Sequence, residues 1–142
     1  MRSTRELLES TATSAEPLDI VVPFTTPQLT RIALTKAADL TAEIPSRIRV
    51  LRMQRVPFPL PLDHSPVSVE ILREQVRKAT SDVAPAEIVI YLTREPVETL
   101  LDSLEPRSIL VIASKWRPWR TAQERLKRIC ERQGNHVALV YA

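Results

Sequence analysis

Apolar and polar residues follow one another along the chain in a pattern that predicts alternating strands and helices. Short runs rich in valine, isoleucine and leucine predict five buried strands, at residues 19–24, 47–53, 87–92, 108–113 and 136–141. Between them, apolar residues recur at helical spacing, which predicts helices at residues 27–44, 67–83, 96–104 and 121–133. The order βαβαβαβαβ favours a parallel sheet with helices on both faces, so the predicted fold class is a doubly wound α/β domain.

Several local signals set the ends of these elements. Thr26-Pro27 supplies an N-cap and a proline at the first helical position, and Thr121 with Glu124 forms a capping-box pattern. Gly134 follows the last helix at the position where a positive φ is tolerated. Residues 56–66 hold four prolines and predict an extended connection. In the second strand, the basic residues at alternate positions of 47–53 indicate a side or end that is less covered.

The rest of the organisation is simple. Residues 1–18 are polar and predict a flexible arm, with a short helix at residues 5–10, and residues 19–142 form the one domain that 142 residues suggest. No apolar run reaches the length of a membrane span, and the N-terminus lacks the apolar core of a secretory signal. Cys130 is the single cysteine, which is consistent with a reducing compartment, so a cytoplasmic location is expected.

Glycine content excludes whole classes of nucleotide site. The chain has one glycine, against about ten at average usage. Phosphate-binding loops of the Walker A and dinucleotide types need several glycines, because backbone N–H groups must approach the phosphates closely. The sequence therefore predicts no glycine-cradled nucleotide site and no bound cofactor.

Charge adds one local feature. The net charge is only +3, but cations cluster between residues 115 and 132, where Glu124 and Glu131 are the acids. The simplest interpretation of the cluster is a solvated helix face. At its start, residues 115–120 read KWRPWR, which places two tryptophans and three cations between the fourth predicted strand and the last helix.

Four segments resemble the universal stress protein family in their order and spacing. Residues 20–34 (IVVPFTTPQLTRIAL) resemble the family's first strand, turn and helix, and residues 87–101 (EIVIYLTREPVETLL) resemble its third strand and following helix. Residues 108–113 (SILVIA) look like its fourth strand, and residues 121–126 (TAQERL) like the start of its last helix. The resemblance covers about residue 19 to the end and implies a five-stranded sheet in the order 3-2-1-4-5.

The family's ATP-binding branch provides a specific test of these residues. That branch carries G-x2-G-x9-G-[ST] after the fourth strand, an aspartate after the first strand, and an apolar adenine contact near the end of the second. Here the aspartate position falls on Thr25, and the three motif glycines fall on Ala113, Trp116 and Arg120. Only three residues separate the last two, where the motif has nine. Thr121 and Met53 keep the final [ST] and the apolar contact, but the departures predict no ATP binding in the family's manner.

The KWRPWR segment leaves alternatives open. If the first and fourth strands are neighbours, Thr25, Thr26 and residues 114–121 line the point where ligands bind in doubly wound sheets. A helix N-terminus at Thr121 with Lys115, Arg117 and Arg120 then suggests a pocket for a phosphate-bearing anion. Alternatively, Trp116 and Trp119 fill the space of a nucleotide or pack against a second subunit. Stacking of the rings on a nucleic-acid base is a third, less favoured, possibility.

The function predicted from the sequence is that of a non-enzymatic domain of universal stress type, acting in stress response or regulation through protein contacts. Family members often dimerise through the last strand, which implies a homodimer edge at Val137, Leu139 and Tyr141. The alternatives are an anion- or nucleotide-binding sensor that uses residues 115–121, and a cytosolic regulatory domain related to a permease. No arrangement of nucleophile, base and orienting group is recognisable, and Asp63-His64 in the proline-rich connection is expected to be loop surface.

Overall fold

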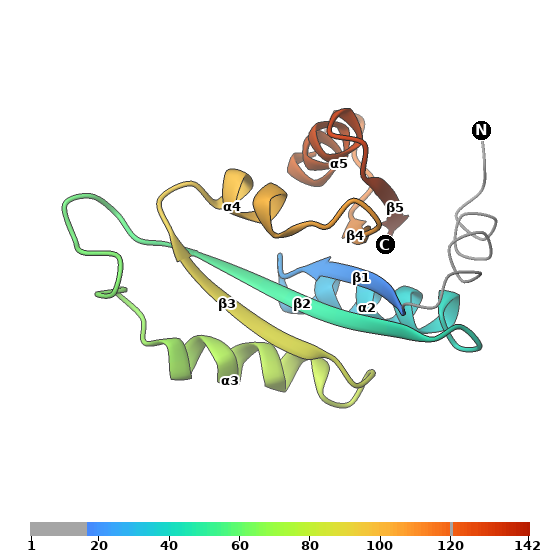
Figure 1. Cartoon of the computed structure of the whole chain (residues 1–142), viewed down its shortest axis with the longest axis horizontal. Helices are drawn as coiled ribbons and strands as arrows, with labels where there is room; N and C mark the ends of the chain where they lie inside the picture. The colour runs from blue at the N-terminus through green and yellow to red at the C-terminus, as the bar shows by residue number, and fades with distance from the viewer. Residues whose placement is uncertain (1–16, 120) are drawn as a thin grey trace.

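The strands and helices alternate as the sequence predicts. The computed structural model (Figure 1) describes residues 17–119 and 121–142, so most of the predicted N-terminal arm lies outside the described residues. Its strands are β1 (Leu18–Pro23), β2 (Ser46–Arg55), β3 (Glu87–Thr93), β4 (Ile109–Ser114) and β5 (His136–Tyr141). Its helices are α2 (Pro27–Leu40), α3 (Val69–Thr80), α4 (Pro96–Ser103) and α5 (Ala122–Arg132).

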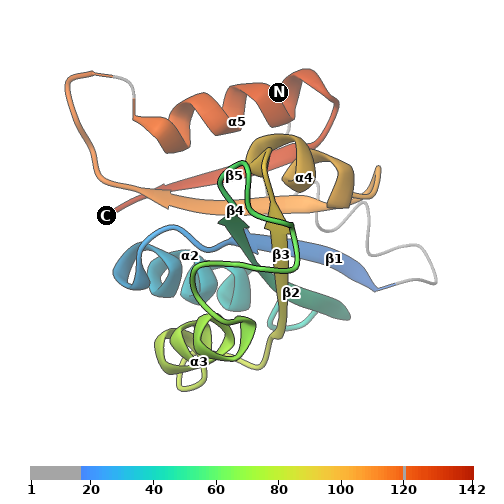
Figure 2. The same cartoon turned by 90° about the vertical axis from the view of Figure 1, so that its left-hand side faces the viewer.

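The five strands form one parallel sheet in the order β3-β2-β1-β4-β5. Helices α2 and α3 cover one face, and α4 and α5 cover the other (Figure 2). The strand order and the helices on both faces confirm the predicted doubly wound fold. The order places β3 and β5 at the two edges, and β1 lies in the middle, where all six of its residues are buried.

Side chains from alternate positions of the strands build a separate core on each face. Toward α2 and α3, Ile20 and Val22 of β1 pack in a cluster that includes Leu34 of α2 and Val76 of α3. Toward α4 and α5, the intervening residues form a second cluster, whose buried members are Val21, Leu51, Leu100, Leu110, Ile112 and Cys130. Because successive strand residues point to opposite faces, the near-continuous apolar runs supply both cores at once.

Most predicted helix ends are confirmed. The Thr26 hydroxyl accepts from the Leu29 N–H at 3.1 Å, and Gly134 has a φ of +91°. Helix α2 ends at Leu40, four residues earlier than predicted, and the turn that follows is closed by a hydrogen bond from Ile44 N–H to the Thr41 carbonyl. Helix α3 starts only at Val69, because Ser68 caps it by accepting from the Ile71 N–H.

The expectation of a less covered side along the basic part of β2 is wrong for Arg49. Its side chain is buried, 8% exposed, and forms a two-pronged ion pair with the buried Asp19 of β1, at 2.9 and 2.7 Å. The Ser108 hydroxyl donates to the same carboxylate at 2.6 Å. The register of β1 against β2 places Asp19 opposite Arg47 and Val21 opposite Arg49, so both arginines reach Asp19.

Candidate functional site

The sheet contains one point where neighbouring strands send their helices to opposite faces. Strands β1 and β4 pair directly, yet β1 continues into α2 and β4 continues toward α5. The segments after these strands, residues 24–26 and 115–119, therefore diverge and leave an opening at the carboxyl end of the sheet. Ligands of doubly wound proteins bind at such openings.

The start of α5 is held firmly at this opening. Thr121 and Glu124 form the predicted capping box: the Thr121 hydroxyl accepts from the Glu124 N–H, and the Glu124 carboxylate accepts from the Thr121 N–H, both at 3.2 Å. The hydroxyls of Ser114 and Thr121 are also hydrogen bonded to each other at 2.9 Å. These bonds tie the end of β4 to the N-terminus of α5.

A cavity of about 450 Å³, the loop pocket, lies at this opening. It is lined by Thr26, Leu29, Ser114, Lys115, Arg117, Trp119, Thr121, Ala122, Gln123 and Arg125. Four residues of the predicted ligand site are thus brought together: Thr26, Lys115, Arg117 and Thr121. Arg125, one turn into α5, joins them, and the sequence offered no signal for its role beyond the general basic cluster.

Other residues of the predicted site lie elsewhere. Thr25 lines a different cavity, together with Thr26, and Met53 packs against the apolar cluster between the sheet and α4. Trp116 is not among the residues lining the loop pocket. Arg120 lies outside the described residues.

The loop pocket has the chemistry of an anion site. Lys115, Arg117 and Arg125 line it, and no carboxylate is among its described lining residues. Glu124 is near in sequence but is used in the capping box. Helix N-termini carry partial positive charge, and the N–H groups of Ala122 and Gln123 belong to the first turn, which has no partners within the helix.

Neither tryptophan of the KWRPWR segment is buried at the opening, although Trp119 lines the loop pocket. Trp116 is 67% exposed and Trp119 is 66% exposed, so neither ring is buried among core residues. Of the three alternatives for these rings, the filled nucleotide space is therefore not supported by their exposure. Packing against a second subunit and stacking on a nucleic-acid base remain, and both are contacts with another molecule, as exposed tryptophans in a group are unusual on a free surface.

The predicted dimer edge runs beside this loop. Val137 and Leu139 of β5 are partly buried against the α4–α5 cluster, whereas Tyr141 is 50% exposed. A groove of about 430 Å³ follows the strand and is lined by Lys36, Leu40, Lys127 and residues 137–141. The Ala142 N–H donates to the Ser114 carbonyl at 2.9 Å, which places the end of β5 next to the start of the tryptophan loop.

The remaining candidates are structural. Asp63 and His64 are hydrogen bonded to each other at 2.9 Å on the surface, as expected of loop residues. Cys130 is fully buried, and burial raises the pKa of its thiol to about 11, with Glu131 adding to the shift. Within residues 17–119 and 121–142, no group of three or more metal-ligating side chains occurs, and no helix is long and apolar enough to cross a membrane.

Comparison with known proteins is informative at the level of structure. No family model and no curated protein matches the sequence. Solved structures do match: UspA from Lactobacillus plantarum gives a TM-score of 0.55 at 14% identity, over 89% of this chain and 99% of that one. A universal stress protein in complex with cAMP gives a TM-score of 0.53 at 18% identity, over 89% of this chain and 98% of that one. A protein of the universal stress protein family from Burkholderia pseudomallei gives a TM-score of 0.58 at 17% identity, over 91% of this chain and 99% of that one.

This chain has the universal stress protein fold. The agreement spans almost the whole of each compared structure, and the strand order is the one that the sequence resemblance implied. Identities of this size establish the fold alone. The function of the universal stress fold in this chain therefore has to be argued from its own side chains.

Proposed function

We propose that this chain is a non-enzymatic regulatory domain of universal stress type that dimerises and acts through protein contacts. The observations that carry the proposal are the free edge of β5 and the two exposed tryptophans in the loop that follows its neighbour β4. Among the described residues β5 has one neighbour, β4, so its outer backbone groups are available to a second strand. Tyr141 of β5, and Trp116 and Trp119 of the loop after β4, add exposed aromatic surface of the kind that is typical of interface cores.

The proposal includes the absence of family-type ATP binding. Side chains at Ala113 and Trp116 occupy positions where the ATP-binding motif has glycine. A triphosphate held by main-chain N–H groups needs bare backbone at those positions, because a side chain prevents the close approach. The loop is also shorter than the motif by six residues, since three stand where nine are needed.

Oligomeric state tests the proposal directly. Light scattering across a range of concentrations should give a dimer for the unaltered chain, and Tyr141→Glu should shift it toward monomer by placing like charges at the paired edges. Ile71→Glu is the matched control, because Ile71 is an exposed apolar residue on α3, far from β5. A monomer at high concentration, or equal loss of dimer in both variants, would refute the edge-paired dimer.

Tryptophan fluorescence provides an independent measurement. Both rings are exposed in the single chain, so a dilute sample should show red-shifted emission that iodide or acrylamide quenches. If the rings enter the interface, emission should shift to the blue and become protected as the dimer forms. Emission that stays red and fully quenchable while scattering reports a dimer would remove the tryptophans from the proposed contact.

A second candidate function is an anion or nucleotide sensor at the loop pocket. What favours it is the convergence of Lys115, Arg117 and Arg125 with the Thr121 N-terminus of α5. One structural relative is a complex with cAMP, so cyclic nucleotides belong among the ligands to be tested.

Thermal shift with ATP, AMP, cAMP and inorganic phosphate tests the sensor. A rise in melting temperature that is lost in Arg125→Gln would support it, since Arg125 lines the pocket on a capped helix and is not needed for the cap. No rise with any of the four would reject the sensor for these ligands. Stoichiometric, high-affinity binding of ATP would instead contradict the argument from the missing glycines.

A further inference from the structure

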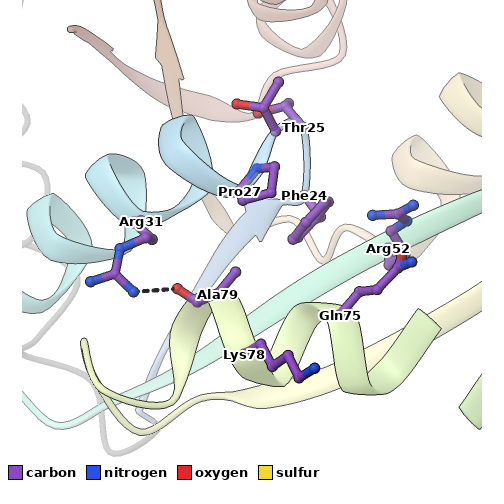
Figure 3. Close-up of a pocket in the computed structure, with 9 residues that line it drawn as sticks. Phe24, Thr25, Pro27, Arg31, Arg52, Gln75, Lys78 and Ala79 are labelled. Atoms are coloured by element: carbon purple, nitrogen blue, oxygen red, sulfur yellow. Dashed lines mark hydrogen bonds between the residues drawn. The ribbon is translucent and has the colours of Figure 1, made fainter. Parts of the chain in front are cut away.

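A second and larger cavity, the α2–α3 cavity, lies between α2, α3 and the ends of β1 and β2 (Figure 3). Its volume is about 690 Å³, within the range of small-molecule sites. It is lined by Phe24, Thr25, Thr26, Pro27, Arg31, Arg52, Gln75, Lys78 and Ala79. Met53, the position that matches an adenine contact by resemblance, packs in the cluster on the α4–α5 side. The α2–α3 cavity therefore does not include that contact, although it shares Thr25 and Thr26 with the ligand site predicted from the sequence.

One wall of the cavity is apolar and is fixed by strand pairing. The Phe24 N–H donates to the Leu51 carbonyl at 2.8 Å, which sets Phe24 beside the next residue of β2, Arg52. The Arg52 guanidinium lies over the Phe24 ring, 4.5 Å from its centroid. Pro27 and Ala79 extend the apolar wall on the neighbouring helices (Figure 3).

Two cations face this wall without an acidic partner. Arg52 comes from β2 and Lys78 from α3, and both line the cavity. Within the described part of the chain, no carboxylate forms a salt bridge with either of them. Burial lowers the pKa of Arg52, which means that its surroundings disfavour the charge rather than neutralise it. The guanidinium nevertheless stays protonated at neutral pH.

The third cation at the cavity is in a different situation. Arg31 donates to both oxygens of Asp82, at 2.7 and 3.1 Å, and to the Ala79 carbonyl at 2.9 Å. These bonds join α2 to the end of α3 and close one side of the cavity (Figure 3). Arg31 is therefore a structural part of the wall, whereas Arg52 and Lys78 keep their donors for another group.

We propose that the α2–α3 cavity binds a small organic anion. Its apolar body rests on Phe24, Pro27 and Ala79, and its carboxylate or phosphate group accepts charge-assisted hydrogen bonds from Arg52 and Lys78. The pairing of an apolar wall with two unneutralised cations selects for a ligand that has both parts, since either part alone leaves half of the cavity unsatisfied. This site does not depend on the dimer, and it shares only Thr26 with the loop pocket.

Four probes separate the two parts of the recognition. Benzoate and phenyl phosphate carry an aromatic body with a carboxylate or a phosphate, inorganic phosphate carries charge alone, and benzyl alcohol carries the ring alone. In amide NMR titrations of the full chain, we expect saturable shifts at Phe24, Thr25 and Ala79, which line this cavity and not the loop pocket, with benzoate or phenyl phosphate. The better of the two should bind at least about tenfold more tightly than inorganic phosphate or benzyl alcohol.

Matched variants locate the binding. Lys78→Gln changes an exposed side chain on α3, so folding is not at risk, and it should weaken the preferred probe about tenfold, as expected for loss of a charge-assisted hydrogen bond. Arg52→Gln should act similarly, and Arg52→Lys should retain most of the affinity. Arg77→Gln is the control on the same helix, because Arg77 pairs with Glu74 and does not line the cavity.

The outcomes are decisive in both directions. A loss of probe affinity in Lys78→Gln but not in Arg77→Gln supports the site. An equal loss of affinity in both variants would show a general charge effect and would overturn the proposal. Chemical shifts that do not saturate by about 20 mM probe would overturn it as well, and so would binding of inorganic phosphate with equal affinity. Arg125→Gln should have no effect here, and a loss in that variant would assign the binding to the loop pocket instead.

Discussion

The ion pair between Asp19 and Arg49 allows a quantitative prediction about stability. Asp19 is 6% exposed and Arg49 is 8% exposed, and the carboxylate accepts from Arg49 Nε at 2.9 Å, Arg49 Nη2 at 2.7 Å and the Ser108 hydroxyl at 2.6 Å. Asp19→Asn removes the negative charge and leaves the buried guanidinium uncompensated. The expected cost is about 3–5 kcal/mol in the free energy of unfolding. That is a large part of the about 5–15 kcal/mol typical of whole domains.

Urea unfolding followed by circular dichroism measures this cost, because the exposed tryptophans are poor reporters of the core. Asp82→Asn is the matched control: Asp82 also takes a two-pronged bond from an arginine, Arg31, but these side chains are 64% and 42% exposed. Exposed ion pairs add little to stability, so we expect no resolvable change in the control. Similar losses in the two variants would refute the reasoning from burial.

A double variant separates the ion pair from the burial of its parts. Asp19→Leu alone and Arg49→Met alone each leave one buried charge without its partner, whereas the two substitutions together replace the ion pair by apolar side chains. The double variant should therefore be more stable than either single variant, since the cost comes from the uncompensated charge rather than from loss of a strong attraction. Additive losses in the three proteins would contradict this account.

The same carboxylate makes stability depend on pH. Burial raises the pKa of Asp19, but hydrogen bonds from Arg49 and Ser108 and the positive charges of Arg49 and Arg47 outweigh it, so the pKa lies below its usual value. In the unfolded chain the pKa returns to about 3.9. The stabilisation is thus complete above that pH and is lost as the pH falls through the folded pKa. The difference between the unaltered chain and Asp19→Asn should narrow below about pH 4, and a constant difference would count against the assignment.

Three further predictions concern individual residues. Cys130, with its pKa raised to about 11, should react with a disulfide reagent at pH 8 only after unfolding in urea, and fast reaction of the native protein would contradict its burial. Thr121→Ala should cost about 1 kcal/mol in urea unfolding through loss of the capping box, whereas Thr35→Ala on the exposed side of α2 should cost nothing. In Gly134→Ala the new methyl group meets no neighbouring atom, but alanine has to adopt a φ of +91°, so the free energy of unfolding should fall by about 1 kcal/mol. Gly134→Asn should lower it by less. Equal stability of the alanine and glycine forms would show that the turn relaxes.

The sequence by itself determined the elements of this protein and their succession. The strand runs, the caps at Thr26 and Thr121 and the positive φ of Gly134 depend on residues within a few positions of one another, so local patterns suffice to predict them. The absence of glycine after β4 is likewise a local fact, and it drew attention to the loop whose residues Lys115, Arg117 and Thr121 line one pocket with Thr26.

Only the tertiary structure decided which distant side chains meet. Arg49 and Arg52 are both basic residues of one strand, yet one is paired with Asp19 on the α4–α5 face and the other lies over Phe24 on the α2–α3 face. Which partner each receives depends on strand register, because a shift by one residue exchanges the two faces. The sequence likewise did not decide whether Trp116 is buried or exposed, since a short polar and aromatic segment encodes no preference between the core and a partner's surface.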